Sequence, residues 1–312
     1  MTEHLLRPFR PGDAPVIHEL QARHAKADGA DPHSTMEPPP DPERLRRAME
    51  RADWAVVAVD PSDSVAGWGS LRSWTEDDGT RVYLTDGYVA PPARRRGLGR
   101  RLLRESEAVA ARLCAGHTGN GPVVLGGNAS TVQPDRMALL ERSGYRQVFT
   151  MVEMEHDGSP VRPRQLPDGV TVRAATIADV PALAALTARA WAGRPYFAMP
   201  DVDELRDWLS RSQLALFHVA TIGERLVGLV AASRTPARIE IESVQVDPDL
   251  QRRGLAAAML TRMLSTLSEQ RGTVPIRLHT EGLDPVGARS LYERLGFQVF
   301  REYRRYRKPL SR

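Results

Sequence analysis

The chain carries three short sequence landmarks twice, in the same order, and this repeat constrains its fold more than any other feature. In each pair, the apolar, charged and glycine or small positions agree between the two copies. The pairs are Leu6–Pro15 with Val172–Pro181, Arg94–Gly99 with Gln251–Ala256, and Leu140–Tyr145 with Tyr292–Phe297. Because all three recur in one order, the sequence predicts two units that share one fold.

The segment between the copies has the composition of a linker. Glu155–Gly169 is rich in proline, glycine and charged residues, which favours an irregular, solvated conformation. The 312 residues also suffice for two domains of ordinary size. The sequence therefore predicts an N-terminal domain at residues 1–155, a linker at 156–169 and a C-terminal domain at 170–312.

Hydropathy patterns predict a mixed α/β fold in both copies. Ile239–Val246 alternates apolar and polar residues with the period of a strand, and Asp179 can cap a helix that runs to Ala190. The other helices predicted in the second copy cover 201–211, 254–271 and 286–295, and the strands cover 214–222, 226–234, 275–280 and 297–306. Strands at 54–60, 65–71, 81–89 and 123–126 give the first copy the same order.

Composition excludes several classes of protein. The single cysteine, Cys114, rules out an internal disulfide and a multi-cysteine metal site. No apolar run reaches the ~18–20 residues that would span a bilayer, and no signal-peptide pattern opens the sequence. A net charge of +4 is too small to indicate nucleic-acid binding. We expect a cytoplasmic monomer with no metal, membrane or nucleic-acid partner.

A glycine turn separates a predicted strand from a long predicted helix in each copy. Arg94–Gly99 and Gln251–Ala256 place glycines and arginines where the first helical turn leaves backbone N–H groups unpaired. Such a turn can bind a phosphate group, although a simple strand-to-helix turn has the same pattern. The lysine of a nucleotide triphosphatase loop is absent, and so is the third glycine of a dinucleotide-binding fingerprint.

The combination of motifs in the second copy resembles the GNAT superfamily of acetyl-CoA-dependent N-acetyltransferases. The residues that carry it are Val244–Pro248, Gln251–Ala256, Asp284–Ala288 and Leu291–Phe297. The resemblance implies two tandem GNAT domains, each a mixed, mostly antiparallel sheet flanked by helices and splayed in the middle to hold acetyl-CoA. The tandem arrangement is similar to that of mycothiol synthases.

The resemblance also implies which residues bind the acetyl-CoA co-substrate. In the second copy these are Val244, Gln245, Val246, Gln251, Arg252, Arg253, Gly254, Leu255, Ala256, Asp284 and Ala288. The corresponding first-copy residues are Gly87, Tyr88, Val89, Arg94, Arg95, Arg96, Gly97, Leu98 and Gly99. The family usually has asparagine where this chain has Asp284, so we expect a weaker contact there.

N-acetylation needs a base for the ammonium acceptor and an acid for the departing thiolate. Tyr292 stands at the family's acid position, and Glu240 precedes Gln251 at the spacing of some catalytic glutamates. Glu242 shares the strand face of Glu240 and is a second candidate, as a base or as a site for a cationic acceptor. Packing or salt-bridging roles remain open for all three, and His218 and His279 are alternative bases.

The first copy lacks groups that could move these protons. Its alignment places Tyr83 and Thr85 opposite the two glutamates, and Leu140 opposite Tyr292. We therefore expect the C-terminal domain to acetylate a primary amine, carried by a small molecule or a peptide, while the N-terminal domain is non-catalytic. The alternatives are mycothiol synthase activity proper, or a non-catalytic acyl-CoA sensor or interaction protein.

Overall fold

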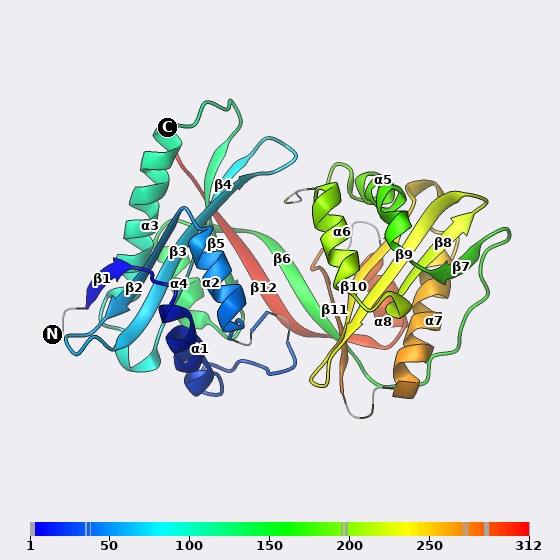
Figure 1. Cartoon of the computed structure of the whole chain (residues 1–312), viewed down its shortest axis with the longest axis horizontal. Helices are drawn as coiled ribbons and strands as arrows, with labels where there is room; N and C mark the ends of the chain where they lie inside the picture. The colour runs from blue at the N-terminus through cyan, green and yellow to red at the C-terminus, as the bar shows by residue number, and fades with distance from the viewer. Residues whose placement is uncertain are drawn as a thin grey trace. The chain divides into compact units, whose positions relative to one another are not determined.

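The computed structural model describes residues 4–34, 36–37, 39–194, 196, 199–270, 272, 274–283 and 287–311. The chain divides into two compact units, which are described separately (Figure 1). Unit 1 comprises Met1–Thr150 and Tyr303–Arg312, and unit 2 comprises Met151–Glu302. Within the described residues, no helix is both long enough and apolar enough to cross a bilayer.

Unit 1 is a sheet with helices on its faces. Its strands follow the order β1-β2-β3-β4-β5-β12, and β4 with β5 is the parallel pair among antiparallel ones. The strands are β1 (Leu5–Pro8), β2 (Trp54–Val59), β3 (Val65–Thr75), β4 (Arg81–Val89) and β5 (Val123–Ser130). The helices are α1 (Asp13–His24), α2 (Pro42–Glu50), α3 (Leu98–Ala115) and α4 (Pro134–Arg142).

Unit 2 repeats this plan. Its strands follow the order β6-β11-β10-β9-β8-β7, and β10 with β11 is the parallel pair. The strands are β7 (Thr171–Ala174), β8 (Phe217–Ile222), β9 (Arg225–Arg234), β10 (Ile239–Val246) and β11 (Ile276–Glu281). The helices are α5 (Val180–Trp191), α6 (Val202–Ser210), α7 (Leu255–Gln270) and α8 (Ala288–Arg294).

The last strand of each repeat completes the sheet of the other unit. Residues Met151–Glu155 of β6 (Arg146–His156) pair antiparallel with β11, whereas Tyr303–Pro309 of β12 (Phe297–Pro309) pair antiparallel with β5. The compact units therefore differ from the sequence repeats by an exchange of two short strands. The predicted mixed α/β class with a mostly antiparallel sheet is confirmed.

The first landmark of the repeat forms the same contact twice. Arg7 binds Asp13 through two hydrogen bonds of 2.8 Å, and Arg173 binds Asp179 through bonds of 2.7 and 2.6 Å. In both units the carboxylate also accepts a backbone N–H three residues earlier, at 2.7 Å, and so fixes the entry to the first helix.

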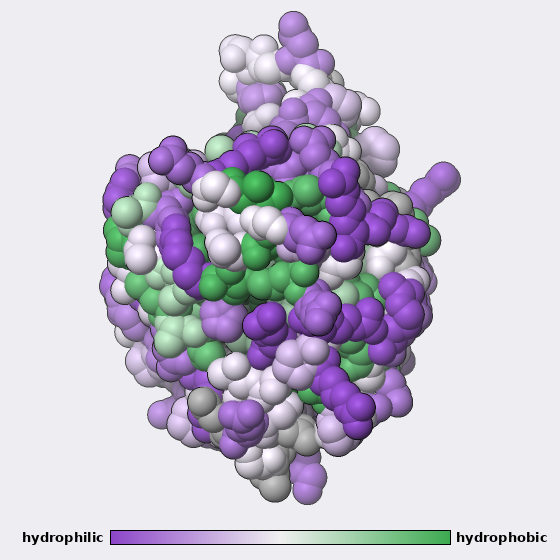
Figure 2. All heavy atoms as spheres, turned by 90° about the vertical axis from the view of Figure 1, so that its right-hand side faces the viewer, coloured by the Kyte–Doolittle hydropathy of each residue, from purple (hydrophilic) through white to green (hydrophobic). Residues whose placement is uncertain are grey.

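One buried cluster of unit 2 lies between its sheet and α7, and a second packs α5 and α6 against the sheet. Ile239, Ile241 and Leu278 pack against α7 residues such as Met259 and Met263, all of them buried. Linker residues join this core, and the backbone N–H of Arg164 donates to Thr261 Oγ1 on α7 at 3.0 Å. At the right-hand end of unit 2 in Figure 1, apolar side chains gather in the middle of the face and hydrophilic ones surround them (Figure 2).

Candidate active site

A cavity opens in unit 2 where β10 and β11 diverge. Among the described residues the parallel pairing runs from Ile239 to Ile241 only, opposite Ile276–Leu278. At Glu242 a β-bulge shifts the register of β10 against β9, since Ile241 pairs with Ala232 and Ser243 with Ala231. A bulge bends its strand and increases the local twist. The remaining residues of β10 thus keep β9 as their partner and leave an open edge toward β11.

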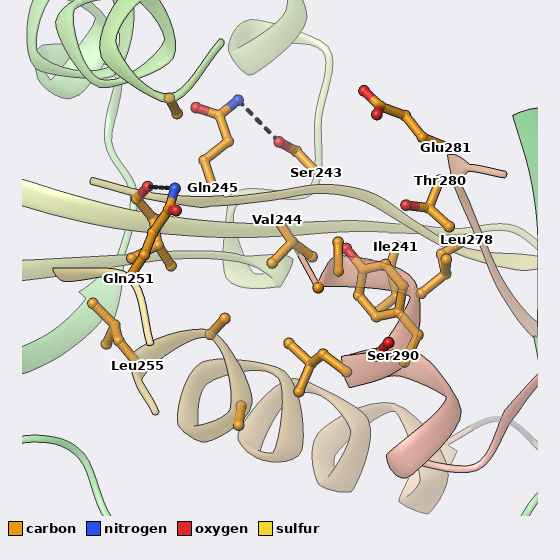
Figure 3. Close-up of a pocket in the computed structure, with 18 of the residues that line it drawn as sticks. Ile241, Ser243, Val244, Gln245, Gln251, Leu255, Leu278, Thr280, Glu281 and Ser290 are labelled. Atoms are coloured by element: carbon orange, nitrogen blue, oxygen red, sulfur yellow. Dashed lines mark hydrogen bonds between the residues drawn. The ribbon is translucent and has the colours of Figure 1, made fainter. Parts of the chain in front are cut away.

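The cavity has a volume of about 580 Å³ and is lined by β10, β11, α5, α7 and α8. Val244 and Ile241 point from β10 to the side of α7, whereas Ser243 and Gln245 point to the opposite side (Figure 3). Of the residues predicted for this copy, those in the lining are Glu242, Val244, Gln245, Val246, Gln251, Arg252, Gly254, Leu255, Ala256, Ala288 and Tyr292. Arg253 is exposed on the same turn, and Asp284 lies outside the described residues.

The turn before α7 has the geometry of an anion site. Arg252 and Gly254 adopt left-handed conformations, with φ of +63° and +83°. An added Cβ at Gly254 would meet nothing within 4 Å, so its positive φ is what favours glycine here. The first helical hydrogen bond runs from Ala258 N to Gly254 O. The N–H groups of the preceding turn are therefore available to a ligand, at the positive end of the helix dipole.

The same turn geometry occurs in unit 1. Arg95 and Gly97 have φ of +62° and +87°, and α3 begins at Leu98. Arg94 Nε donates to Val89 O at 2.8 Å, as Gln251 Nε2 donates to Val246 O at 3.4 Å. The two sequence motifs therefore form one backbone structure.

Buried polar contacts hold the open part of β10 in place. Gln245 accepts from Thr187 on α5 at 3.0 Å and donates to Ser243 Oγ at 3.1 Å. At the end of the strand, Asp247 accepts from Arg189 and Arg225 at 2.9 and 2.8 Å. Burial alone would raise the pKa of Asp247, but the hydrogen bonds from Arg225, a backbone N–H and Arg189 lower it overall.

Tyr292 borders the cavity from α8. Its side chain is buried and meets the ring of Phe297 edge-on, with 6.1 Å between centroids. A phenol in this position can hydrogen-bond to a group inside the cavity and can donate a proton to it.

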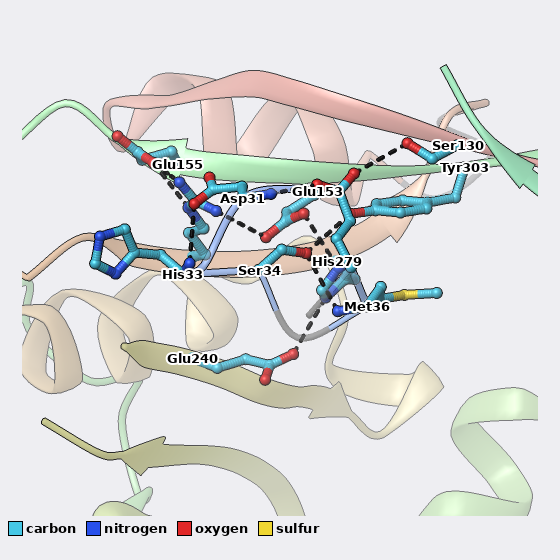
Figure 4. Close-up of polar contacts among 12 residues, drawn as sticks. Asp31, His33, Ser34, Met36, Ser130, Glu153, Glu155, Glu240, His279 and Tyr303 are labelled. Atoms are coloured by element: carbon cyan, nitrogen blue, oxygen red, sulfur yellow. Dashed lines mark hydrogen bonds and ion pairs between the residues drawn. The ribbon is translucent and has the colours of Figure 1, made fainter. Parts of the chain in front are cut away.

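Glu240 contacts His279, and His279 lines the cavity. His279 Nδ1 lies 3.1 Å from Glu240 Oε1, and His279 is in the lining while Glu240 is not (Figure 4). Behind the imidazole, on β6, the fully buried Glu153 lies 3.9 Å from His279 Nε2 and 3.3 Å from Arg277 Nη1. The histidine therefore lies between two carboxylates, one of which is also bound by an arginine.

Two further carboxylates, those of Glu242 and Glu281, line the cavity. Glu242 accepts a hydrogen bond from the indole of Trp208 at 2.9 Å, and Glu281 pairs with Arg194 at 2.9 Å. Arg194 also stacks on Trp191, with 5.3 Å from the guanidinium carbon to the ring centroid. Local sequence had indicated Glu242 and the segment that begins at Arg194, but the pairing of Arg194 with Glu281 depends on tertiary structure.

The structure adds three further findings to the sequence analysis. His218 is outside the cavity lining, and burial lowers its pKa, so the neutral form is favoured. Arg164 of the linker lines the cavity, which nothing in the local sequence indicated.

Strand register corrects the alignment of the first copy. Leu84 pairs with Gly126 as Glu240 pairs with Arg277, and Glu242 is the extra residue of the bulge. Tyr83 and Thr85 therefore do not stand opposite the two glutamates.

Comparison with known proteins agrees with this arrangement. The profile of the acetyltransferase (GNAT) family matches residues 22–119 and 182–297. A mycothiol acetyltransferase of Salinispora tropica is 30% identical over 309 residues, which is 91% of each protein. One of Clavibacter sepedonicus is 31% identical over 229 residues, covering 70% of this chain and 71% of that protein.

Solved structures are similar over the whole length. A GCN5-related N-acetyltransferase of Sphaerobacter thermophilus has a TM-score of 0.76 and 25% identity, covering 98% of this chain and 95% of that one. A tandem GNAT protein from the clavulanic acid pathway has a TM-score of 0.74 over 99% of both chains at 15% identity, which shows the fold alone. Since the family profile covers most of the chain in two regions, this protein belongs to the acetyltransferase (GNAT) family, as an enzyme with tandem GNAT domains.

Proposed function

We propose that unit 2 transfers the acetyl group of acetyl-CoA to a primary amine. The observation that carries the proposal is one cavity with an anion-binding turn, a tyrosine, and a histidine bound to a carboxylate in its lining. The relatives named mycothiol acetyltransferase support a small-molecule acceptor. A cytoplasmic location and a monomeric state stay predictions.

The residues of unit 2 suit a coenzyme A thioester. Its pyrophosphate needs N–H donors and positive charge, which the turn at Gly254 and the exposed Arg252 and Arg253 offer. Within the described part of the chain neither arginine forms an ion pair with an acidic side chain. The open edge of β10 at Val244–Val246 offers N–H and C=O groups to the amide groups of the pantetheine arm.

The catalytic groups divide the two proton transfers between them. Acetyl-CoA supplies the activated acetyl group, and the acceptor must lose a proton before it can attack. We assign that proton to the pair of His279 and Glu240, in which the carboxylate lies 3.1 Å from Nδ1 and holds the ring in place. Tyr292 then donates a proton toward the departing sulfur. Glu240 thus acts through the histidine, and Glu242, which accepts a hydrogen bond from Trp208, contributes negative charge for the cationic acceptor.

The acceptor enters, in this proposal, between Glu242 and Glu281. Both carboxylates and Trp191 are in the lining, and Glu281 is paired with Arg194 at 2.9 Å. A cationic amine with polar substituents fits such a surface. The amino-sugar cysteine conjugate that a mycothiol synthase would acetylate is the first acceptor to test.

The test is an acetyl-transfer assay with the purified chain. It measures thiol release from acetyl-CoA and identifies the product by mass spectrometry, with the amino-sugar thiol, polyamines, amino acids and aminoglycosides as acceptors. Release that depends on one acceptor and yields its N-acetyl derivative supports the proposal. Tight binding of acetyl-CoA with no release for any acceptor would favour a sensor instead.

A further inference from the structure

We infer that Arg136 closes the cofactor cleft of unit 1, so that each chain binds one acetyl-CoA, in unit 2. The inference rests on the proposed function, since it concerns where the co-substrate of that reaction binds. The glycine turn of unit 1 would by itself favour a second site. The contacts around this turn favour a single site instead.

The edge of β4 already has its polar partners. Arg136 on α4 donates from Nη1 to Gly87 O at 3.0 Å and from Nη2 to Asp86 Oδ1 at 2.8 Å. The N–H of Gly87 is hydrogen-bonded to the same Asp86 oxygen at 2.8 Å. Both backbone groups of Gly87 are thus satisfied within unit 1, at the place where unit 2 presents Val244 to its cavity.

The strand itself has a different shape from its counterpart. β3 and β4 pair without a register shift from Gly67 to Thr75, so β4 has no bulge like that of Glu242 in β10. An added Cβ at Gly87 would lie 2.7 Å from Trp68 O, which shows how closely the two strands approach there. The parallel pairing of β4 with β5 also ends, at Thr85 and Gly127, and the carbonyl of Gly87 beyond it has Arg136 as its partner.

Unit 2 has a small residue, Ala288, at the position that corresponds to Arg136. Arg136 stands one helical turn before Leu140, and Ala288 stands one turn before Tyr292. Ala288 lines the cavity of unit 2, whereas a guanidinium occupies the corresponding place in unit 1. Leu140 packs directly over Gly127 on β5, since an added Cβ at that glycine would lie 2.7 Å from its Cδ2.

Two of the three arginines at 94–96 are paired with acidic side chains. Arg94 pairs with Asp28 at 2.6 Å, and Arg95 pairs with Asp135 at 3.2 Å. A pyrophosphate would have to compete with both carboxylates. In the described part of unit 2, Arg252 and Arg253 have no such acidic partner.

The stoichiometry of coenzyme A binding tests the inference. Isothermal titration of the full chain with coenzyme A should give one equivalent, and Gly254→Glu should remove it. Two equivalents would overturn the inference, and so would one equivalent that Gly97→Glu removes and Gly254→Glu spares. No binding at all would overturn the proposed function instead.

Opening the cleft gives the complementary test. Arg136→Ala should raise the stoichiometry from one to two equivalents while turnover in unit 2 is unchanged. Arg142→Ala, an exposed change on the same helix, is the matched control and should stay at one. A folded Arg136→Ala chain that still binds one equivalent would contradict the role of this arginine.

Discussion

His279 Nδ1 lies 3.1 Å from a carboxylate oxygen of Glu240, and the imidazole separates that carboxylate from the cavity. The two residues come from neighbouring parallel strands, in which Glu240 pairs with Arg277. A carboxylate so placed holds the ring in one orientation. In the proposed mechanism the base is therefore a pair of residues rather than a single glutamate.

Replacing His279 should remove the base. We expect His279→Gln to lower kcat by about 10²–10⁴ at neutral pH and to recover part of it at alkaline pH, where the free amine is abundant. Glu240→Gln should cost less, because the imidazole remains. The measurement is the pH dependence of kcat, with His218→Gln as the control, since His218 is outside the cavity lining. Equal activity of His279→Gln and the control at all pH values would exclude the histidine as base.

Tyr292→Phe should separate catalysis from binding. Loss of the hydroxyl removes the proposed acid while the buried ring keeps its contact with Phe297. We expect kcat to fall by about 10²–10⁴ with the affinity for acetyl-CoA unchanged. Steady-state kinetics and calorimetry give the two quantities. A variant with full kcat would leave only a packing role for the tyrosine.

Arg164 connects the linker to the cavity, and its charge should assist the phosphates of acetyl-CoA. Arg164→Ala should raise the KM for acetyl-CoA about tenfold and leave kcat unchanged. Arg162→Ala is the matched control, since Arg162 is exposed on the same linker but is not in the lining. The same KM in both variants would show that Arg164 plays no part in binding.

Unit 2 should lose stability in acid through Asp179. The hydrogen bonds from Arg173 hold the pKa of this carboxyl at about 2, below its ordinary value of 3.8. Because the folded-state pKa is depressed, the stabilisation is fully present above pH 4 and is lost as the pH falls toward 2. Screening of the half-exposed Arg173 limits it to about 1 kcal/mol.

Thermal unfolding between pH 5 and pH 2 measures this effect. Asp179→Asn should unfold at a lower temperature than the wild type at pH 5 and at nearly the same temperature at pH 2. Asp168→Asn, at an exposed linker position, should follow the wild type throughout. A constant difference between Asp179→Asn and the wild type at all pH values would show that ionisation of Asp179 does not contribute.

Local sequence patterns predicted most of the secondary structure. The strands at 81–89 and 239–246 are confirmed with their predicted bounds, because apolar alternation and flanking turns mark a strand clearly. The helix predicted from 254 begins at Leu255, directly after the glycine of the turn. Asp179 was expected to cap the following helix, but its carboxylate accepts from Arg173 and from the backbone N–H of Thr176 and makes no side-chain bond to the first turn of α5.

Features that depend on long-range pairing were not predictable in this way. β6 pairs with β11 and β12 pairs with β5. The sequence of a strand does not show which sheet edge it will pair with, so this exchange could not be predicted. The bulge at Glu242 adds one residue to β10, and a single-residue gap could not be located from the sequence alone. The contact of Glu240 with His279 follows from the register of two strands far apart in the chain.

The central claim is that acetyl transfer takes place in unit 2, on the turn at Gly254. Turnover of acetyl-CoA with a primary amine, compared between Gly254→Glu and Gly97→Glu, tests it most directly. The two glycines have nearly the same positive φ and the same open space beside them, so the variants carry similar strain. We predict that Gly254→Glu abolishes turnover and that Gly97→Glu keeps most of it. Turnover that survives in folded Gly254→Glu and disappears in folded Gly97→Glu would contradict the account.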